Sequence, residues 1–306
     1  MQRVPINSQG SSEEIIGTFI QTLRNAMEIA DSQGIRVMGI GIDTPGPFDF
    51  AKGISLMGRG LGQDKFSSIY GINLRNEFVR RLGLKEGFPI IFEPDSWAFL
   101  RGEAWLGAAK GYNRILGITL GTGLGSAFMV NDEIVIRGPG VPGYGWLAQL
   151  PYRNGVVEDR ISRRGILTRY EELTGKSIRG LDVIDIAKKA MKKDRISLQV
   201  FEETGMILGK ALSRICSDFR PECLVLGGQI SKSFSLFAEP LRNQLRSIPS
   251  LKKITQAKWI DLSPLYGVAK LLFKGTVSPA WSLPTELTEE EAKRIFAELS
   301  QYAVTD

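Results

Sequence analysis

The chain has 306 residues, of which 43% are hydrophobic and 24% charged, and its 39 Lys and Arg against 33 Asp and Glu give a net charge of +6. This composition predicts a globular protein with a buried core, organised as two domains of ordinary size or one large domain. The basic excess lacks the aromatic-interleaved pattern of a nucleic-acid surface, so we expect no nucleic-acid partner. The phosphates of a nucleotide would explain a basic cleft equally well.

The sequence also excludes several kinds of chemistry. It contains no histidine, so every mechanism with a histidine general base is excluded, and its two cysteines, Cys216 and Cys223, lie in apolar contexts typical of core residues. We therefore expect neither a disulfide framework nor a zinc site. The chain begins without an apolar leader and has no run of about 18 apolar residues, which predicts a cytoplasmic protein with no membrane partner.

The first part of the chain alternates helix and strand patterns. Ser11 and Glu14 fit a capping box, and apolar residues at helical spacing follow them. The apolar run at 35–42 has the length of a strand and ends in a sharp Pro-Gly-Pro turn around Gly46. Further patterns predict a glycine-rich loop at 58–64, helices at 73–84 and 95–110, and a strand at 88–92.

The second part begins with a strand meander. Apolar runs at 115–120 and 125–130 are joined by a glycine-rich turn, and Asn131-Asp132 predicts a second hairpin turn. Antiparallel strands here predict a mixed rather than a purely parallel sheet. Further patterns predict a loop at 137–156, helices at 157–174, 183–193, 196–219, 232–246, from 263 and from 288, and strands at 133–136, 223–226 and 258–260.

Asp95 is the candidate catalytic residue. It follows the apolar run at 88–92 and opens a helical pattern. A sugar hydroxyl needs a carboxylate within hydrogen-bond reach to take its proton as it attacks a γ-phosphate. The alternative is that Asp95 only caps its helix, a common role worth about 1 kcal/mol.

Two glycine-rich turns are candidate nucleotide contacts. Gly121, Thr122 and Gly123 would let backbone N–H groups approach phosphate oxygens, with the Thr122 hydroxyl as a further donor, and a tight hairpin is the alternative. Gly227 and Gly228 end a buried apolar run, where either a ligand lies against the backbone or the chain simply turns.

Glu158 is a lone acid at a predicted helix start. The preference of acidic side chains for helix N-termini explains it without any function, and a ligand contact is the alternative. The nearby Arg160, Arg163 and Arg164 favour a solvated helix face over a phosphate clamp.

The order of these parts, namely acid, glycine hairpin, second acid and double glycine, resembles the ROK family (repressor, open reading frame, kinase) of bacterial sugar kinases. IGIDTPGPFDFAKGI is similar to the family's GIGxPGPVDxxxGxI, and FPIIFEPDSWAFLRGEAWLGAAKG to its PVxVENDANAAALGEAWLGAAKG. ITLGTGLGSAFMVNDEIVIRGPGVPG resembles its second phosphate motif and the following hairpin, GVVEDRISRRGIL its GCLEAYASGxAL, and PECLVLGGQIS its PExIVLGGGxx. The similarity extends over about residues 35–274.

The resemblance implies an α/β, two-lobed actin-like ATPase fold with a ribonuclease H-like core, the first lobe being truncated at its N-terminus. The lobes would be 1–108, which carries the catalytic acid, and 109–274, followed by an appended tail at 275–306 with one helix. The implied cofactor is ATP with Mg²⁺, without zinc, the implied partner is a sugar or sugar-like substrate, and the family's tendency to dimerise implies a homodimer.

The resemblance also assigns roles by position. Asp95 corresponds to the catalytic base, and no residue is assigned to a protein-held metal. The remaining positions are Gly121, Thr122, Gly123, Gly227 and Gly228 for the nucleotide, and Glu158, Gly46 and Gly60 for the sugar, Gly60 standing where the family has an Asn.

The chain departs from the family at several polar positions. The Asp-Gly-Gly-Thr phosphate motif and the cysteine zinc cluster do not occur, Pro94 replaces an Asn, and Tyr144 and Leu147 align with the Glu and His of the family's GExGH segment. Polar sugar contacts worth about 1–3 kcal/mol each would thereby be lost.

Two functions therefore stay open: an ATP-dependent sugar kinase, and a non-catalytic ROK-fold protein that binds a small ligand or a protein partner. A DNA-binding repressor would require a winged helix ahead of residue 35, for which we expect no room.

Overall fold

The computed structural model describes residues 3–58, 65–275 and 277–304. Its contacts divide the chain into two units, Met1–Asp95 with Val268–Glu286, and Ser96–Gly267 with Leu287–Asp306. This division differs from the one expected after residue 108. The reason is that the body of helix α3 (Asp95–Leu106) packs within the second unit, for example with Phe99 against Gly227.

The first unit contains two parallel strands. Strand β1 (Ile40–Thr44) pairs with β4 (Ile90–Pro94), so that both strands end at the same edge. The predicted strand at 35–42 starts later than expected because β4 offers partners only from Ile90 onward. The other elements of this unit are α1 (Ser12–Ser32), β2 (Phe48–Asp49), β3 (Ile54–Ser55), η1 (Ser67–Ile69), α2 (Leu74–Leu82) and η5 (Pro279–Ser282).

Aromatic rings form the core of the first unit. The centroid of the Phe92 ring lies 5.0 Å from that of Phe48 and 6.3 Å from that of Phe78. Helix α1 starts with the predicted capping box, in which Ser11 and Glu14 satisfy each other's backbone N–H groups, and this prediction is confirmed.

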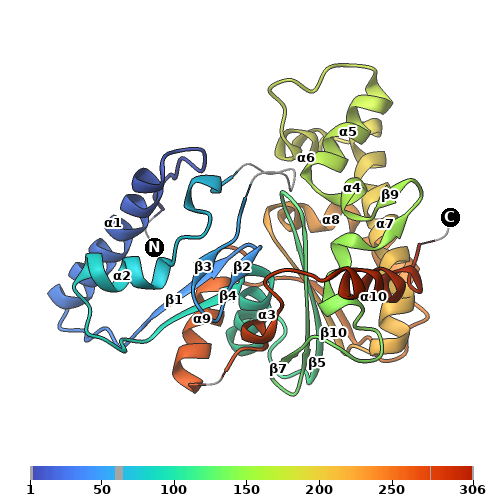
Figure 1. The fold of residues 1–306 in the computed structure, drawn as a ribbon. Coiled ribbons are helices and arrows are strands. Elements are labelled where there is room, and N and C mark those ends of the chain that lie inside the picture. The colour runs from blue at the N-terminus through green and yellow to red at the C-terminus, as the bar shows by residue number, and fades with distance from the viewer. Residues whose placement is uncertain (1–2, 59–64, 276, 305–306) are drawn as a thin grey trace. The chain divides into compact units, whose positions relative to one another are not determined.

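The second unit is built on a five-stranded mixed sheet with the order β11-β10-β5-β6-β7. Figure 1 labels β5, β7 and β10 of this sheet. The first three of these strands run parallel, and β5, β6 and β7 form an antiparallel meander. The prediction of a mixed sheet is therefore confirmed. The strands are β5 (Arg114–Leu120), β6 (Leu124–Val130), β7 (Glu133–Val135), β10 (Cys223–Gly227) and β11 (Lys253–Gln256).

Helices and short elements complete the second unit, and α9 continues into the first. They are η2 (Gly143–Gly145), η3 (Leu147–Gln149), β8 (Pro151–Tyr152), β9 (Gly155–Val156), α4 (Glu158–Ile161), α5 (Arg163–Thr174), α6 (Val183–Met191), α7 (Arg195–Phe219), η4 (Gln229–Ser233), α8 (Phe234–Leu245), α9 (Ser263–Lys274) and α10 (Glu289–Ser300). The predicted helix at 157–174 is broken at Ser162, whose side chain caps α5.

One predicted strand is wrong. Residues 258–260 form a turn, and the edge strand is β11. The backbone N–H groups of Lys258 and Trp259 donate to the buried carboxylate of Glu103, at 3.0 Å each, instead of joining a sheet.

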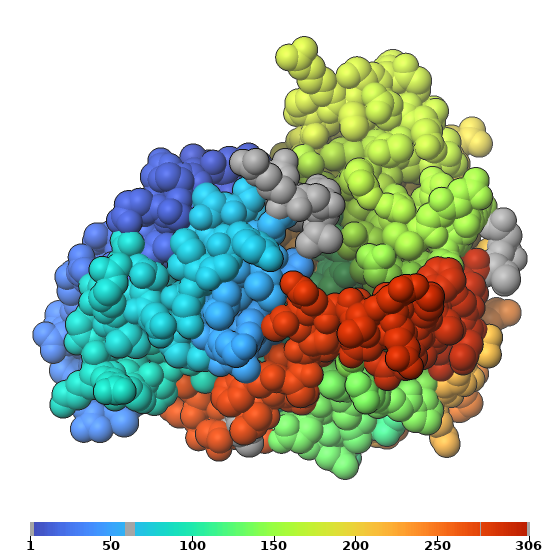
Figure 2. All heavy atoms as spheres, in the orientation of Figure 1, coloured from blue at the N-terminus to red at the C-terminus, as the bar shows by residue number. Residues whose placement is uncertain are grey.

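Both cysteines are core residues, as predicted. Cys216 and Cys223 are fully buried, and burial raises the pKa of each thiol to about 12. Helix α10 lies on the outside of the second unit (Figure 2). Within the part of the chain that the structure describes, no helix is long and apolar enough to cross a membrane.

Candidate functional site

The glycine turn of the second unit joins β5 to β6. Leu120 pairs with Leu124, and the N–H of Gly121 donates to the carbonyl of Gly123 at 3.0 Å, which closes a tight hairpin. Thr122 lies exposed at the tip of this turn. The turn therefore places backbone groups and one hydroxyl at the end of a central strand.

The two glycines of this turn are there for different reasons. A Cβ on Gly123 would come within 2.6 Å of Oε2 of Glu158, so a side chain there would require the Glu158 carboxylate to move. A Cβ on Gly121 would meet no atom within 4 Å, and the backbone of Gly121 does not adopt a positive φ. Neither packing nor conformation thus requires glycine at 121, whereas close approach of a ligand to the backbone would.

Gly227 and Gly228 lie beside this turn because β10 and β5 run parallel and end together. A Cβ on Gly227 would overlap the Phe99 ring, and one on Gly228 would overlap the Leu120 carbonyl. Gly228 also has a φ of +78°. Packing and conformation therefore explain both glycines without a ligand, although their backbone remains at the same sheet edge as Gly121.

Glu158 connects α4 to the glycine turn. Its Oε2 accepts a hydrogen bond from the N–H of Leu124 at 2.7 Å, so the side chain holds the hairpin rather than its own helix end. The second oxygen, Oε1, has no hydrogen-bond partner among the described residues. The preference of acidic side chains for helix N-termini therefore does not fully explain Glu158. One oxygen of its carboxylate stays available to a polar ligand.

In the first unit, the ends of β1 and β4 bring two acids to one edge. Asp43 lies one residue before the end of β1, and Asp95 directly follows β4. Burial, together with the negative charge of Asp95, raises the pKa of Asp43 to about 6. Sequence reasoning missed Asp43, although it carries the same signal as Asp95: an acid at the end of an apolar strand.

The other predicted site residues of the first unit are glycines. Gly46 is exposed after β1, and a Cβ there would meet only the Phe48 nitrogen at 3.9 Å, so packing does not require glycine. Gly60 lies outside the described residues, as does most of the predicted loop at 58–64. Beside Asp43, a cavity of about 350 Å³ has mostly apolar walls, among them Ile42, Phe48 and Phe92.

The segment aligned with the family's GExGH motif is filled by the chain's own side chains. Tyr144 is 5% exposed and Leu147 is 1% exposed. Helix α10 contacts this segment: Arg294 donates to the Tyr144 hydroxyl at 3.2 Å, and the N–H of Gly143 donates to Glu298 at 2.9 Å. These positions offer no carboxylate or imidazole to a sugar.

Acidic groups that could hold a metal are few. Within the described ranges, no group of three or more Cys, His, Asp or Glu side chains has a metal-binding arrangement.

The mixed α/β fold is shared with solved ROK family kinases, which confirms the fold class predicted from the sequence. The family model of the ROK family matches residues 2–274, and the chain belongs to this family.

Relatives of both kinds, kinase and repressor, resemble the chain. A glucokinase of Thermotoga maritima is 25% identical over 256 residues, covering 78% of this chain and 76% of the glucokinase. A putative xylose repressor of Caldicellulosiruptor sp. is 22% identical, covering 75% of this chain and 60% of the repressor. The crystal structure of a ROK family glucokinase from Streptomyces griseus in complex with glucose and AMPPNP matches with a TM-score of 0.67 at 20% identity, covering 85% of this chain and 88% of that one.

Proposed function

We propose that this chain is an ATP-dependent sugar kinase in which Asp95 is the general base. The observation that carries the proposal is Gly121, because neither the packing nor the backbone conformation of the turn explains a glycine there. In the proposed reaction, the phosphates of ATP lie against the backbone of Gly121–Gly123, and the adenosine lies toward Gly227 and Gly228. The glucokinase and N-acetyl-D-glucosamine kinase relatives support a sugar as the acceptor.

The acid pair of the first unit fits the role of a base. A base must be ionised before it takes a proton, and the negative charge of Asp95 is one cause of the raised pKa of Asp43. Asp95 then takes the proton of the attacking sugar hydroxyl, and the free oxygen of Glu158 is a candidate acceptor for another hydroxyl of the sugar.

The cofactor of the proposed reaction is ATP with Mg²⁺. The metal neutralises charge on the phosphates during transfer. In the proposal, this chain contributes the backbone N–H of Gly123 and the hydroxyl of the exposed Thr122 as further phosphate donors.

The test measures ADP release from Mg-ATP with a panel of hexoses, N-acetylhexosamines and pentoses. We expect turnover with at least one sugar, and Asp95→Asn should reduce kcat at least 100-fold while the protein stays folded. Glu86→Gln removes an exposed acid of the same unit and should leave kcat unchanged. Absence of turnover over the whole panel would overturn the proposal.

A second candidate function is a non-catalytic ROK protein that binds a ligand or a protein partner. The observation that favours it is the buried Tyr144 and Leu147 at the aligned sugar-contact segment, held by α10. Calorimetry separates the two functions. Micromolar binding of Mg-ATP would contradict the non-catalytic function, whereas lack of ATP binding by the folded protein would contradict the kinase.

A further inference from the structure

Helices α4 and α5 hold the glycine turn of the second unit from two sides. The Oε2 oxygen of Glu158, the first residue of α4, accepts a hydrogen bond from the N–H of Leu124 at 2.7 Å. The backbone N–H of Arg163, the first residue of α5, donates to the carbonyl of Gly121 at 2.8 Å. The position of the turn therefore depends on these two helix starts as well as on β5 and β6.

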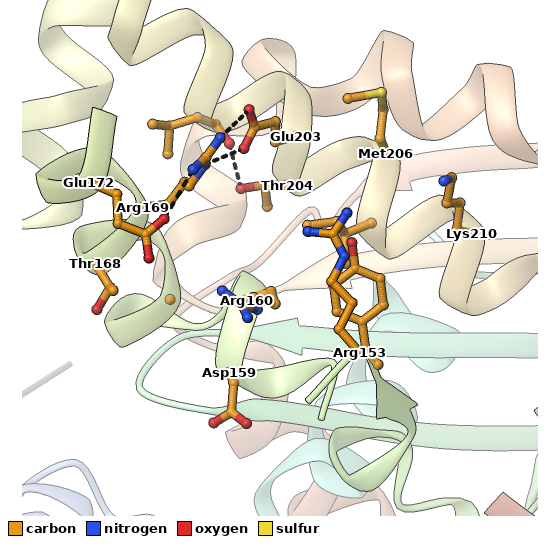
Figure 3. A pocket seen from close by; sticks show the side chains of 14 residues that line it. Arg153, Asp159, Arg160, Thr168, Arg169, Glu172, Glu203, Thr204, Met206 and Lys210 are labelled. Carbon is orange, nitrogen blue, oxygen red and sulfur yellow. Dashed lines mark hydrogen bonds and ion pairs between the residues drawn. The ribbon is translucent and has the colours of Figure 1, made fainter. Parts of the chain in front are cut away.

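Helix α5 is itself fixed to the long helix α7. Arg169 of α5 binds both carboxylate oxygens of Glu203 on α7, at 2.6 and 3.0 Å (Figure 3). Bidentate pairs of this kind fix the geometry of the two partners as well as adding stability. The hydrogen bond from Arg163 to the turn therefore comes from a helix that is held in place, whereas the contact from α4 depends on a single side-chain carboxylate.

Gly123 leaves room for the Glu158 carboxylate to approach the turn. A Cβ at position 123 would lie 2.6 Å from Oε2 and 3.4 Å from the carboxylate carbon of Glu158. The φ of Gly123 is not positive, so the backbone conformation does not require glycine there. The glycine and the carboxylate are thus matched to each other, and their close approach allows the hydrogen bond to Leu124.

The two oxygens of the Glu158 carboxylate differ in their surroundings. Oε2 holds Leu124, whereas Oε1 has no hydrogen-bond partner within 3–58, 65–275 and 277–304. An ionised carboxylate can accept at both oxygens, and because the group is rigid and planar, a ligand on Oε1 also fixes the direction in which Oε2 points.

We propose that Glu158 is a positioning residue that couples the two substrates. A sugar hydroxyl that donates to Oε1 holds the carboxylate in the orientation in which Oε2 holds the phosphate turn. This inference rests on the proposed kinase function. Whichever substrate binds first completes the ordering of the turn, so the second substrate binds to a turn that is already ordered. The coupling is reciprocal, and we expect each substrate to tighten binding of the other about tenfold.

Titration calorimetry of the full chain tests the coupling with Mg-AMPPNP, glucose and N-acetyl-D-glucosamine, each alone and the nucleotide with each sugar. Glu158→Gln keeps an oxygen for the Leu124 N–H but turns an NH₂ group toward the sugar. We therefore expect its AMPPNP affinity without sugar to stay within about twofold of the parent, while the tenfold coupling is lost. Glu158→Ala removes both contacts and should also weaken binding of AMPPNP alone about fivefold.

Glu171→Gln is the matched control. It changes an exposed acid of α5 and should leave both affinities and their coupling unchanged. A purely structural role of Glu158 would weaken binding of AMPPNP alone in the Gln variant as well, and it would not remove the coupling selectively.

Hydrogen exchange of the ligand-free chain tests the hold on the turn separately. Glu158→Ala should increase exchange of the peptide at 120–124, whereas Glu158→Gln should not. Gly123→Ala should also increase exchange, because the new Cβ displaces the carboxylate, and it should add nothing in the Glu158→Ala background. Unchanged exchange at 120–124 in Glu158→Ala would overturn the proposal.

The calorimetric outcomes separate the coupling from the kinase function. Lack of AMPPNP binding by the folded parent would contradict the kinase function and, with it, the coupling. AMPPNP binding that neither sugar changes would overturn the coupling alone, and so would a coupling that survives in Glu158→Gln.

Discussion

Two loops of the second unit are candidates for ligand contact, and they differ in what surrounds them. The turn at Gly121–Gly123 presents an exposed Thr122, and the space beside the Gly121 Cα is open. The segment at 140–147 has its side chains buried, and α10 supplies hydrogen bonds to its backbone and to the Tyr144 hydroxyl. The chain's own side chains fill the segment at 140–147, whereas the tip of the turn at Gly121–Gly123 is open.

The difference shows how to separate glycines and polar groups that serve the fold from those that are available to a ligand. Packing accounts for Gly228 and Gly227, a Cβ at Gly123 would displace the Glu158 carboxylate, and contact with α10 accounts for Tyr144. No internal contact accounts for Gly121. In the first unit, Asp43 resembles Gly121 in that the fold does not explain it. Its raised pKa means that the fold stabilises the ionised carboxylate less than water does.

The largest expected effect is that of Gly228→Ala. The new Cβ would overlap the backbone of Leu120 at a φ of +78°, and backbone atoms cannot move aside as a flexible side chain could. We expect a loss of roughly 4 kcal/mol or more in the free energy of unfolding, measured by urea denaturation. Gly180→Ala is the matched control, because Gly180 has a φ of +79° in open space, and its loss should be about 1 kcal/mol. Equal losses at both positions would contradict the packing explanation.

Asp43→Asn should change the pH dependence of stability. The pKa of Asp43 is raised from 3.8 to about 6. The contribution of its carboxyl group to the free energy of unfolding is therefore fully present below pH 3.8 and is lost as the pH rises through about 6. At about 1.4 kcal/mol per pKa unit the loss approaches roughly 3 kcal/mol at pH 8. The variant, which cannot ionise, should therefore be more stable than the parent at pH 8 and no more stable at pH 4.

The same urea titrations include a control. Asp31→Asn changes an exposed acid of α1 and should give the same difference from the parent at both pH values. A parallel response of the two variants would show that Asp43 does not carry the pH dependence.

The sequence predicts elements whose ends are set by local chemistry. The capping box of α1 is confirmed at Ser11, and the helix expected from 288 starts at a capping box formed by Thr288 and Glu291. The turn at Asn131-Asp132 has the two positive φ values of 49° and 70° that such a hairpin needs. Caps and tight turns involve only neighbouring residues, so their signals can be read from a short window of sequence.

Elements that depend on distant partners were predicted less well. The strand expected at 258–260 does not form, because its N–H groups bind Glu103, more than 150 residues earlier. Glu103 appeared in the sequence only as part of a matched motif, with no sign of its burial. The site shows the same limit. Asp95, Glu158 and the glycines could be found from motifs, but only the folded structure shows that Asp43 shares an edge with Asp95 and that Glu158 binds the N–H of Leu124.

Leu299→Ala tests whether α10 keeps the segment at 140–147 in place. Leu299 is 3% exposed, and its side chain lies beside Gly143, so its truncation should cost about 2–3 kcal/mol and increase hydrogen exchange of the peptide at 140–147. Phe296→Ala on the same helix changes a side chain that is 66% exposed and should cost less than about 0.5 kcal/mol. Unchanged exchange at 140–147 in the Leu299 variant would contradict the role of α10.

Gly121→Ala gives the smallest expected change in stability and the most direct test of the open turn. A methyl group fits the empty space at 121, so the free energy of unfolding should change by less than about 0.5 kcal/mol. The same methyl would stand where we propose that a phosphate approaches the backbone, and Mg-ATP affinity measured by calorimetry should fall about tenfold, or about 1.4 kcal/mol. Gly17→Ala, in open space on α1, is the control for glycine replacement in general and should leave ATP affinity unchanged. A destabilised Gly121→Ala variant would contradict the open space at this position. A variant that binds ATP as tightly as the parent would contradict the proposed contact between a phosphate and the Gly121 backbone.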